Sequence, residues 1–328
     1  MNIYDIAKEA GVAISTVSRV LNNGVVTDAT REKVQRVLDK YDYKPSAIAR
    51  GLVSKTMKTI GVLLVDVRVS HYANTAYVLE QEFTESGYNV LLCNTGGSMS
   101  NNIKYIKMLS ERQVDGLVLV GSIFDEIRNE PSIMEILSNM PVVLANGHLD
   151  LPNSYSVLVD DRLGIKLSVD HLYEKGHKNI LYVKDMNTAS AEIKKEGFIM
   201  AMKEKDIYKG EETIFNTEYG FDGGKKVAHD ILESGIEFSA IVFGEDLTAV
   251  CAMKELKKMG LRVPEDVAIT GYNNSEVAMV ADTELTSVDN KFEMLASLSA
   301  NLLSGLIDKK DNAASLTIQP VLVVRQSS

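Results

Sequence analysis

Short apolar segments that alternate with longer amphipathic ones run through most of this 328-residue chain, and they restrict its fold more than any other feature. Ten apolar segments follow the first 58 residues, each rich in Val, Ile or Leu: 59–66, 88–95, 114–121, 141–147, 156–161, 179–185, 212–218, 239–245, 266–273 and 285–290. Near-continuous apolar strands separated by helices are typical of parallel sheets covered on both faces. We therefore expect an α/β fold with two doubly wound parallel-sheet lobes.

Seven segments between or after these strands have helical periodicity: 76–86, 102–112, 161–175, 191–205, 223–234, 247–259 and 292–307. Gly87, Gly176, Gly235 and Gly260 each follow a helical segment, where a left-handed residue closes the last turn. In open α/β sheets the ligand crevice lies beyond the carboxyl ends of the strands. Polar residues and one glycine at those ends are candidates to face a cleft, with loop capping as the alternative role: Asp66, Asn94, Gly121, Asn146, Asp185, Glu218, Glu245 and Asn273.

The first 45 residues predict three short helices, over about 3–10, 15–22 and 30–41. Gly11 separates the first two helices, and Thr27 is a suitable N-cap for the third. Two helices joined by a tight turn form a helix-turn-helix, whose second helix enters the major groove of DNA. Apolar residues supply a small core: Ile6, Ala7, Ala10, Val12, Val17, Val20, Leu21, Val34, Val37 and Leu38.

The second helix has a polar face of the residue types that contact DNA. Its apolar positions leave five side chains toward solvent: Ser15, Thr16, Ser18, Arg19 and Asn22. Arg19 can donate two hydrogen bonds to a guanine edge, and the others can meet bases or phosphates. The alternative is an ordinary solvated face, and the turn signature before the helix favours DNA contact.

The charge distribution agrees with a DNA-binding head on an acidic body. Residues 1–58 hold ten Lys or Arg against six Asp or Glu, whereas the rest of the chain holds 25 against 39. Phosphate contacts dominate affinity for DNA, so the basic segment is the candidate for that role. The polar N-terminus and the lack of a long apolar run predict a cytoplasmic protein without a membrane span. Cys93 and Cys251 lie in apolar segments and are expected to be reduced thiols.

The sequence closely resembles the lactose-repressor (LacI/GalR) family along nearly the whole chain. Residues 3–23, IYDIAKEAGVAISTVSRVLNN, resemble its head, and 43–52, YKPSAIARGL, resemble its hinge. TIGVLLVD, GYNVLLCNT, RQVDGLVLV, GHKNILYV, LRVPEDVAITGYN, LTSV and VLVVRQSS resemble its core in order. The resemblance implies a transcription regulator, in most cases a repressor, that binds operator DNA. It also adds Tyr4, Ile14 and Thr30 to the expected DNA contacts.

The resemblance implies a helix-turn-helix domain over 1–44, a hinge helix and linker over 45–58, and an effector-binding and dimerisation core over 59–328. The core divides into an N-lobe, about 59–159 and 291–319, and a C-lobe, about 160–290 and 320–328, as in periplasmic binding proteins. The resemblance further implies that the hinge helix orders on DNA, with Ala49 making contacts and Leu52 wedging into the minor groove. A buried hinge-core position is the alternative for Leu52.

Carried over position by position, the resemblance predicts seven effector contacts: His71, Tyr72, Lys194, Tyr219, Asp246, Asn273 and Asn290. Lys194 stands where the family usually has Arg, and Asn273 where it usually has Asp. Lys is a point charge, and Asn carries donors and no negative charge. A phosphorylated sugar is therefore weighed beside an ordinary sugar as the small-molecule effector. Ala13 replaces the family's usual capping Ser, at a cost of about 1 kcal/mol.

Three other interpretations remain beside this one. A catabolite-control-type regulator, whose corepressor is a phosphorylated carrier protein, shares Lys194 and the RQSS terminus. A sugar-binding transport protein shares the two-lobed core but leaves the first 58 residues unexplained. An enzyme is disfavoured because His148 with Asp150, or His171 with His177, matches no catalytic or metal signature. We expect no cofactor and no metal. The resemblance implies a homodimer that pairs through both lobes. The lack of a heptad repeat after the last strand argues against a tetramer.

Overall fold

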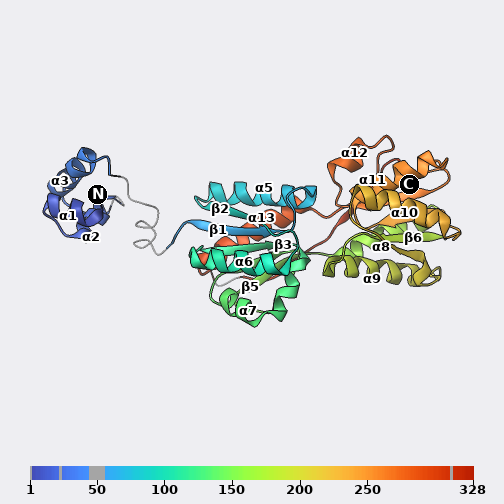
Figure 1. Ribbon diagram of the computed structural model, residues 1–328, viewed down its shortest axis with the longest axis horizontal. Coiled ribbons are helices and arrows are strands. Elements are labelled where there is room, and N and C mark those ends of the chain that lie inside the picture. The colour runs from blue at the N-terminus through green and yellow to red at the C-terminus, as the bar shows by residue number, and fades with distance from the viewer. Residues whose placement is uncertain (1, 22–23, 44–55, 311–312) are drawn as a thin grey trace. The chain divides into compact units, whose positions relative to one another are not determined.

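The structure is a computed structural model that describes residues 2–21, 24–43, 56–310 and 313–328. The chain divides into two compact units, Met1–Thr59 with Gln113–Asp115 and Ile60–Arg112 with Gly116–Ser328. The first unit contains a three-helix head, and the second contains two parallel α/β sheets (Figure 1). The expected fold class is confirmed.

The head consists of α1 (Ile3–Ala10), α2 (Ile14–Leu21) and α3 (Asp28–Lys40). Asn2 caps α1 by accepting from the backbone N–H groups of Tyr4 and Asp5, and Gly11 ends α1 in the left-handed conformation. Thr27 caps α3, as predicted, by accepting from Thr30 N at 3.4 Å. The buried core is formed by Ile6, Ala7, Ala10, Val17, Val20, Val34, Val37 and Leu38. A core this small fixes the helices only because all three contribute to it.

The N-lobe sheet has the order β11-β5-β4-β3-β1-β2, and β1, β3, β4, β5 and β11 pair in parallel. Its strands are β1 (Thr59–Leu64), β2 (Asn89–Asn94), β3 (Gly116–Val120), β4 (Val142–Ala145), β5 (Ser154–Val159) and β11 (Leu316–Ile318). Helices α5 (Ser70–Glu85) and α13 (Phe292–Ile307) cover one face, and α6 (Met99–Glu111) covers the other. A Cβ on Gly61 of β1 would lie 2.8 Å from Leu109 of α6, so glycine permits this close packing.

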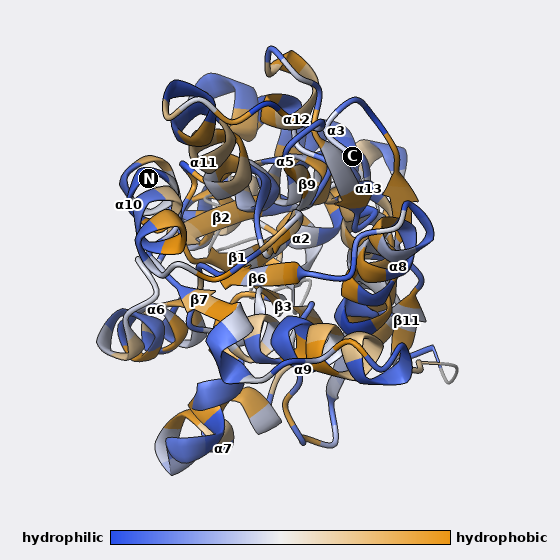
Figure 2. Cartoon of the chain, turned by 90° about the vertical axis from the view of Figure 1, so that its right-hand side faces the viewer, coloured by the Kyte–Doolittle hydropathy of each residue, from blue (hydrophilic) through white to orange (hydrophobic). Residues whose placement is uncertain are grey.

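The C-lobe sheet has the order β12-β10-β9-β8-β6-β7. Its strands are β6 (Ile180–Lys184), β7 (Ile214–Asn216), β8 (Ala240–Phe243), β9 (Ala268–Tyr272), β10 (Thr286–Asp289) and β12 (Val321–Val323). Helices α8 (Asp161–Glu174) and α9 (Ala189–Glu204) pack on one face, and α10 (Phe221–Glu233) and α11 (Asp246–Lys258) on the other. Strands β6 and β7 are mostly hydrophobic, whereas the helices around them carry both kinds of residue (Figure 2).

The chain passes between the lobes three times, from β5 to α8, from β10 to α13 and from β11 to β12. The last passage makes β12 antiparallel to β10, with Val288 paired to Leu322. Ser327 then fastens the end of the chain, because its hydroxyl accepts from Thr286 N at 2.9 Å and donates to Ile269 O at 2.6 Å. The lobes are therefore covalently joined at three places.

The predicted strands and helices match the observed ones within a few residues, and α5 is the main exception. It begins at Ser70, six residues before the predicted start at 76, so the turn-like segment after β1 is already helical. Five elements had no counterpart among the predicted strands and helices: the 3-10 helix η1 (Ser122–Asn129), α7 (Pro131–Ser138), α12 (Glu276–Val280), β11 and β12. The predicted strand over 212–218 begins instead as the 3-10 helix η2 (Glu211–Thr213). The glycines predicted to close helices, Gly87, Gly176, Gly235 and Gly260, all have positive φ.

Cys93 and Cys251 are free thiols, as predicted. Within the described ranges, no helix combines the length and the apolar character needed to cross a bilayer.

Candidate functional site

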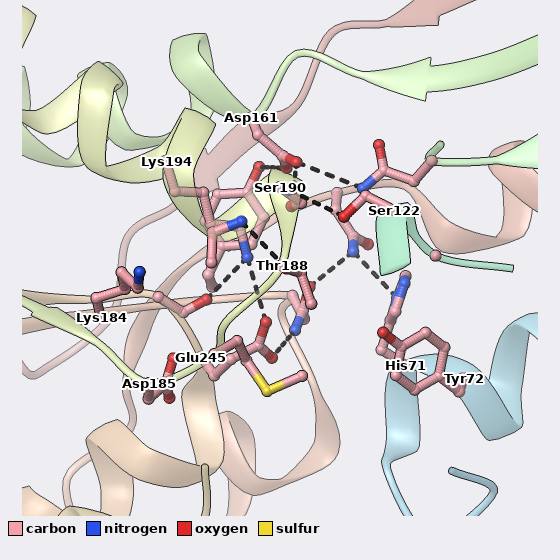
Figure 3. Close-up of a pocket in the computed structure, with 18 of the residues that line it drawn as sticks. His71, Tyr72, Ser122, Asp161, Lys184, Asp185, Thr188, Ser190, Lys194 and Glu245 are labelled. Carbon is pink, nitrogen blue, oxygen red and sulfur yellow. Dashed lines mark hydrogen bonds and ion pairs between the residues drawn. The ribbon is translucent and has the colours of Figure 1, made fainter. Parts of the chain in front are cut away.

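A polar cavity lies in the second unit where the carboxyl ends of both sheets meet (Figure 3). Its wall is formed by His71, Tyr72, Gly121, Ser122, Asn146, Asp161, Tyr182, Lys184, Asp185, Met186, Thr188, Ser190, Ala191, Lys194, Gly244, Glu245, Tyr272, Asn273 and Asn290. The cavity volume is about 40 Å³, little more than one water molecule occupies in the liquid. An adjoining groove of about 450 Å³ shares His71 and Asn273 with it. A sugar-sized ligand therefore requires the lobes to separate or these two side chains to move.

One chain of hydrogen bonds crosses the cavity from Lys194 to His71. The Lys194 ammonium donates to Gly244 O at 2.9 Å and lies 3.2 Å from Glu245 Oε1. Asn273 Nδ2 donates to the second oxygen of Glu245, and Asn273 Oδ1 accepts from Asn290 Nδ2 at 2.7 Å. Asn290 Nδ2 also lies 3.2 Å from His71 Nδ1, so His71 is an acceptor at this nitrogen. The side-chain amides of Asn273 and Asn290 thus link the Lys194–Glu245 ion pair to the neutral His71.

Asp161, the first residue of α8, is the centre of a second set of contacts. Its Oδ1 accepts from the Tyr272 hydroxyl at 2.6 Å, and its Oδ2 accepts from the Ser190 hydroxyl at 2.5 Å. Asn146 Nδ2 lies 3.4 Å from the same Oδ2. Because Asn146 follows β4 of the N-lobe while Ser190 and Tyr272 belong to the C-lobe, this carboxylate contacts both lobes. Ser190 N also donates to the N-lobe residue Ser122, whose Oγ accepts at 2.9 Å.

Burial shifts the protonation equilibria of the cavity. It lowers the pKa of His71 to about 4, with help from the charge of Lys194, so His71 is neutral. Burial also raises the pKa of Glu245, although Lys194 opposes that shift. Burial alone would lower the pKa of Lys194, but the nearby carboxylates outweigh it and the pKa is raised. Lys194 therefore stays protonated, and its ammonium also lies 3.8 Å from the centroid of the Tyr272 ring.

Five of the seven residues predicted to contact an effector line this cavity: His71, Tyr72, Lys194, Asn273 and Asn290. Tyr219 lines a neighbouring groove instead, together with Lys184, Asp185 and Met186. Asp246 is buried, but its carboxylate accepts from Ser275 N at 2.7 Å and from Ser287 Oγ at 2.6 Å. Asp246 therefore holds the loop after β9 in place. Its role as an effector contact stays a prediction.

Among the strand-end candidates, Gly121, Asn146, Asp185, Glu245 and Asn273 reach the cavity wall, whereas Asp66, Asn94 and Glu218 do not. Asp66 pairs with Arg68, and Asn94 accepts from Val67 N. Seven polar wall residues were absent from both sets of candidates: Ser122, Asp161, Tyr182, Lys184, Thr188, Ser190 and Tyr272. Asp161 is the last residue of the segment 156–161, where the chain passes to the C-lobe, and that position is the signal that identifies it.

In the head, the polar face of α2 is open to solvent. Ile14, Ser15 and Arg19 are exposed, and Thr16 and Ser18 are partly exposed. Tyr4 on α1 is 67% exposed, although it belongs to a residue type that usually buries its ring. Thr30 is half-buried, with its hydroxyl 2.8 Å from that of Thr27. Asn22, Ala49 and Leu52, also predicted to contact DNA, lie outside the described residues, as does the hinge over 45–54.

Ala13 precedes α2, and its side chain offers no acceptor to the first turn. Its carbonyl accepts from the N–H groups of Thr16 and Val17 at 2.9 and 3.2 Å. The helix therefore begins on backbone contacts at this residue, and the expected loss of a cap remains a prediction about stability. A Cβ added at Gly24 would lie 3.3 Å from the Cβ of Arg19. Gly24 thus permits the chain to pass closely beside the end of α2.

An exposed helix-turn-helix on a chain with a two-lobed, polar-cavity core defines the class of DNA-binding transcription regulators with a core like that of periplasmic binding proteins. Residues 2–46 match the family described as bacterial regulatory proteins, lacI family, and residues 169–328 match the periplasmic binding protein-like domain. The matched regions coincide with the head and with the C-lobe and the chain that follows it.

An HTH-type transcriptional regulator of Lachnoclostridium phytofermentans is 36% identical over 331 residues, covering 100% of this chain and 99% of that protein. The ribose operon repressor of Halalkalibacterium halodurans is 30% identical, with 99% and 96% covered. A crystal structure of the lac repressor dimer bound to operator and the anti-inducer ONPF has a TM-score of 0.85 at 23% identity, with 100% and 98% covered. At that identity the structural match shows a shared fold.

The chain belongs to the lacI family of bacterial transcription regulators. It is a DNA-binding regulator and not an enzyme, as the sequence predicted. A regulator of this family acts on bacterial DNA, in agreement with the expected cytoplasmic localisation. The family also rules out the transport-protein interpretation, because the lacI-type head occupies the first residues of the chain.

Proposed function

We propose that this protein is a repressor whose affinity for operator DNA is set by a small polyhydroxylated molecule bound between the two lobes. The observation that carries the proposal is the cavity itself, where carboxylate, amide and hydroxyl groups of both lobes converge on one buried space. Carboxylates and amides accept and donate the hydrogen bonds that sugar hydroxyl groups require. The ribose operon repressor among the relatives supports a sugar-related effector.

The charges of the cavity favour an uncharged or positively charged ligand over a phosphorylated sugar. Lys194, the residue that suggested a phosphate, lies against Glu245 and is not available as an unpaired cation. Asp161 and Asp185 add two further carboxyl groups to the wall. A phosphate brought into this space meets like charges at short range, which costs binding free energy in a buried site. An ordinary sugar is therefore better supported as the effector than a phosphorylated sugar.

For the head, we propose that residues 1–44 bind operator DNA, with α2 in the major groove and residues 45–58 connecting the head to the core. The exposed Arg19 and Ser15 support base contacts, and two further predicted contacts, Ile14 at the start of α2 and Tyr4 on α1, are also exposed. The proposed roles of Ala49 and Leu52 in the minor groove rest on the family resemblance. The core over 59–328 divides, in this proposal, into the two lobes that the two sheets define.

We also propose a homodimer that pairs through both lobes. Each lobe has exposed apolar side chains of the kind that interfaces bury. In the N-lobe, Tyr77 is 66% exposed and lies beside Leu92 and Val67 along one apolar groove. In the C-lobe, Val280 is 79% exposed and shares a groove with Met253. The lac repressor dimer bound to operator is a precedent for two-fold pairing in this fold.

The effector proposal is tested by measuring operator affinity in the presence of candidate ligands. Genomic fragments bound by the full-length protein supply the operator, and fluorescence anisotropy with a panel of sugars measures the affinity. At least one sugar should shift the operator Kd, and Asn290→Ala should abolish the shift. Asn139→Ala, an exposed amide at the end of α7, is the matched control and should retain it. An operator Kd unaffected by every sugar contradicts the proposal.

The dimer is tested separately by sedimentation. Tyr77→Asp and Val280→Asp each place a charge on one of the two apolar surfaces, and each variant should shift the protein toward monomer. Asp222→Asn on α10 serves as an exposed control in the C-lobe. A wild-type protein that sediments as a monomer while bound to operator contradicts pairing of any kind.

A further inference from the structure

Three buried polar atoms on the cavity wall lack a hydrogen-bond partner among the residues that the structure describes: Tyr182 Oη, Asp185 Oδ2 and Asn290 Oδ1. Tyr182 is fully buried, and Asp185 is 3% exposed. Buried polar groups in folded proteins are nearly always bonded, and leaving one unbonded costs about 1–3 kcal/mol. All three residues line the same cavity, so one molecule bound there after the lobes separate can supply the partners that these atoms lack. Two of them accept only, and the phenol can donate.

The cavity also holds more carboxyl groups than cations. Glu245 is paired with Lys194, and Lys184 is paired with Glu192 outside the wall. Asp161 is bonded by neutral donors, the Tyr272 and Ser190 hydroxyl groups and the Asn146 amide. Asp185 forms no ion pair within the described part of the chain, and its ionised form is favoured by a hydrogen bond from Thr248, by the more distant charge of Lys194 and by its own backbone N–H. Two carboxyl groups of the wall are thus left without a cation in contact.

Asp185 is the one of these two that has an open acceptor atom. It directly follows β6, and Tyr182 lies on the same strand three residues earlier. Burial and the neighbouring charge of Glu245 raise the pKa of Asp185 to about 7, which is the expected effect of a missing cation. A positive group bound against Asp185 Oδ2 supplies both the missing hydrogen bond and the missing charge.

We propose that the ligand carries a protonated amino group beside its hydroxyl groups, with the amine seated against Asp185 Oδ2 and an adjacent oxygen accepting from the Tyr182 hydroxyl. The ligand class is an amino-substituted polyol, such as an amino sugar. This inference rests on the proposed function, in which a polyhydroxylated molecule binds in the same cavity. Asn290 Oδ1 accepts a hydroxyl or amine proton on the opposite side, next to His71.

Calorimetric titration of the full-length protein with matched ligand sets tests the proposal. Each set contains a hexose, its 2-amino derivative and its 6-phosphate, in the gluco, galacto and manno series. The aminated member of at least one set should bind about 10- to 100-fold more tightly than its neutral partner, as expected for a hydrogen bond to a charged group. The phosphorylated member should bind more weakly than both.

Two variants separate the charge at Asp185 from a general effect on the fold. Asp185→Asn should remove the preference for the aminated ligand and leave affinity for the neutral one within about threefold, because only the charge is lost. Asp222→Asn removes an exposed carboxylate of the same lobe and should retain the preference.

Tyr182→Phe tests the contact made by the Tyr182 hydroxyl. It breaks no bond within the described protein, so the variant should fold normally and bind both ligands about three- to tenfold more weakly.

The outcomes distinguish this inference from the function on which it rests. If neutral sugars bind as well as aminated ones and shift operator affinity, the amine inference is wrong and the proposed function stands. The same holds if Asp185→Asn keeps the full preference for the aminated ligand. If no member of any set binds or changes operator affinity, the sugar-effector proposal itself is overturned, and the amine inference with it.

Discussion

The ammonium of Lys194 lies 3.2 Å from Glu245 Oε1 in the cavity between the lobes, where Lys194 is buried and the Glu245 side chain is 15% exposed. The two residues come from different elements, α9 and the end of β8, so the ion pair ties a helix to a strand end. Hydrogen bonds continue from this ion pair through Asn273 and Asn290 to His71 at the start of α5. A change at Lys194 is therefore transmitted to a network that reaches the N-lobe.

Lys194→Met should destabilise the core by about 3–5 kcal/mol, because it leaves the buried Glu245 carboxylate without its cation. The double variant Lys194→Met with Glu245→Gln removes both charges and should recover most of that loss. Urea unfolding followed by circular dichroism measures the free energies. Equal destabilisation in the single and double variants would show that the pair is not the source of the effect.

The pKa of Asp185 predicts a pH-dependent stability difference. The unfolded side chain titrates near pH 3.9, whereas burial raises the folded pKa to about 7. Between those values the folded state retains a proton that the unfolded state has lost, so stability from this group decreases as pH rises. Asp185→Asn should remove that decrease, and the variant should gain on the order of 1–3 kcal/mol over wild type across this window.

The gain from Asp185→Asn should level off above the folded pKa. Thermal unfolding of both proteins from acidic to mildly alkaline pH measures it. His71, whose pKa is lowered to about 4, has the opposite sign and stabilises more as pH rises from 4 toward 6.5, but it is present in both proteins and cancels in the difference. A difference in Tm that is constant with pH would contradict the raised pKa.

Gly164→Ala should weaken both the C-lobe and ligand binding. A Cβ at position 164 would lie 2.7 Å from the Tyr272 hydroxyl, so the ring that bonds Asp161 has to move. Overpacking of this kind costs about 1–3 kcal/mol. Gly305→Ala in α13 has no atom within 4 Å of the added Cβ and should instead stabilise by about 0.5–1 kcal/mol. Opposite shifts in Tm for the two variants are the expected result.

Arg19→Ala should cost about 1–3 kcal/mol of operator binding and relax the base preference at one position of each half-site. Arg36→Ala, an exposed arginine on α3, is the matched control and should leave base preference unchanged. Selection from a library of operator variants measures both effects. Weakening that is uniform across all sequences would make Arg19 a phosphate contact.

The sequence predicts the fold of this protein in most respects, because the central strands of both sheets are short apolar segments. The segment 239–245, for example, contains β8, all four residues of which are fully buried. The start of α5 escaped prediction because residues 70–75 form no apolar stripe of their own. Tyr72 and Thr75 are buried there by contacts with distant parts of the chain, such as the cavity wall.

The sequence predicts where the cleft lies but not which side chains face it. Glu245 and Asp246 are adjacent acidic residues at one strand end, yet Glu245 faces the cavity and Asp246 turns toward Ser275 and Ser287. Sequence spacing places both residues at the right edge but does not determine which side chain points inward. Tyr182 is a second example, because a tyrosine within an apolar strand segment is indistinguishable from ordinary core until its unbonded hydroxyl is located.

Asn290 lies on the passage from β10 to α13, one of the three covalent connections between the lobes, and it contributes to the cavity wall. In the proposed function, ligand contact at this residue acts directly on one of the connections between the lobes. Strand β1 runs away from the cavity edge back to Thr59, next to the segment that leads to the head, a span of roughly 20 Å at strand spacing. In the proposed function, a small rotation of the N-lobe about these connections displaces the Thr59 end of β1 more than the cavity edge, because displacement grows with distance from the axis of rotation.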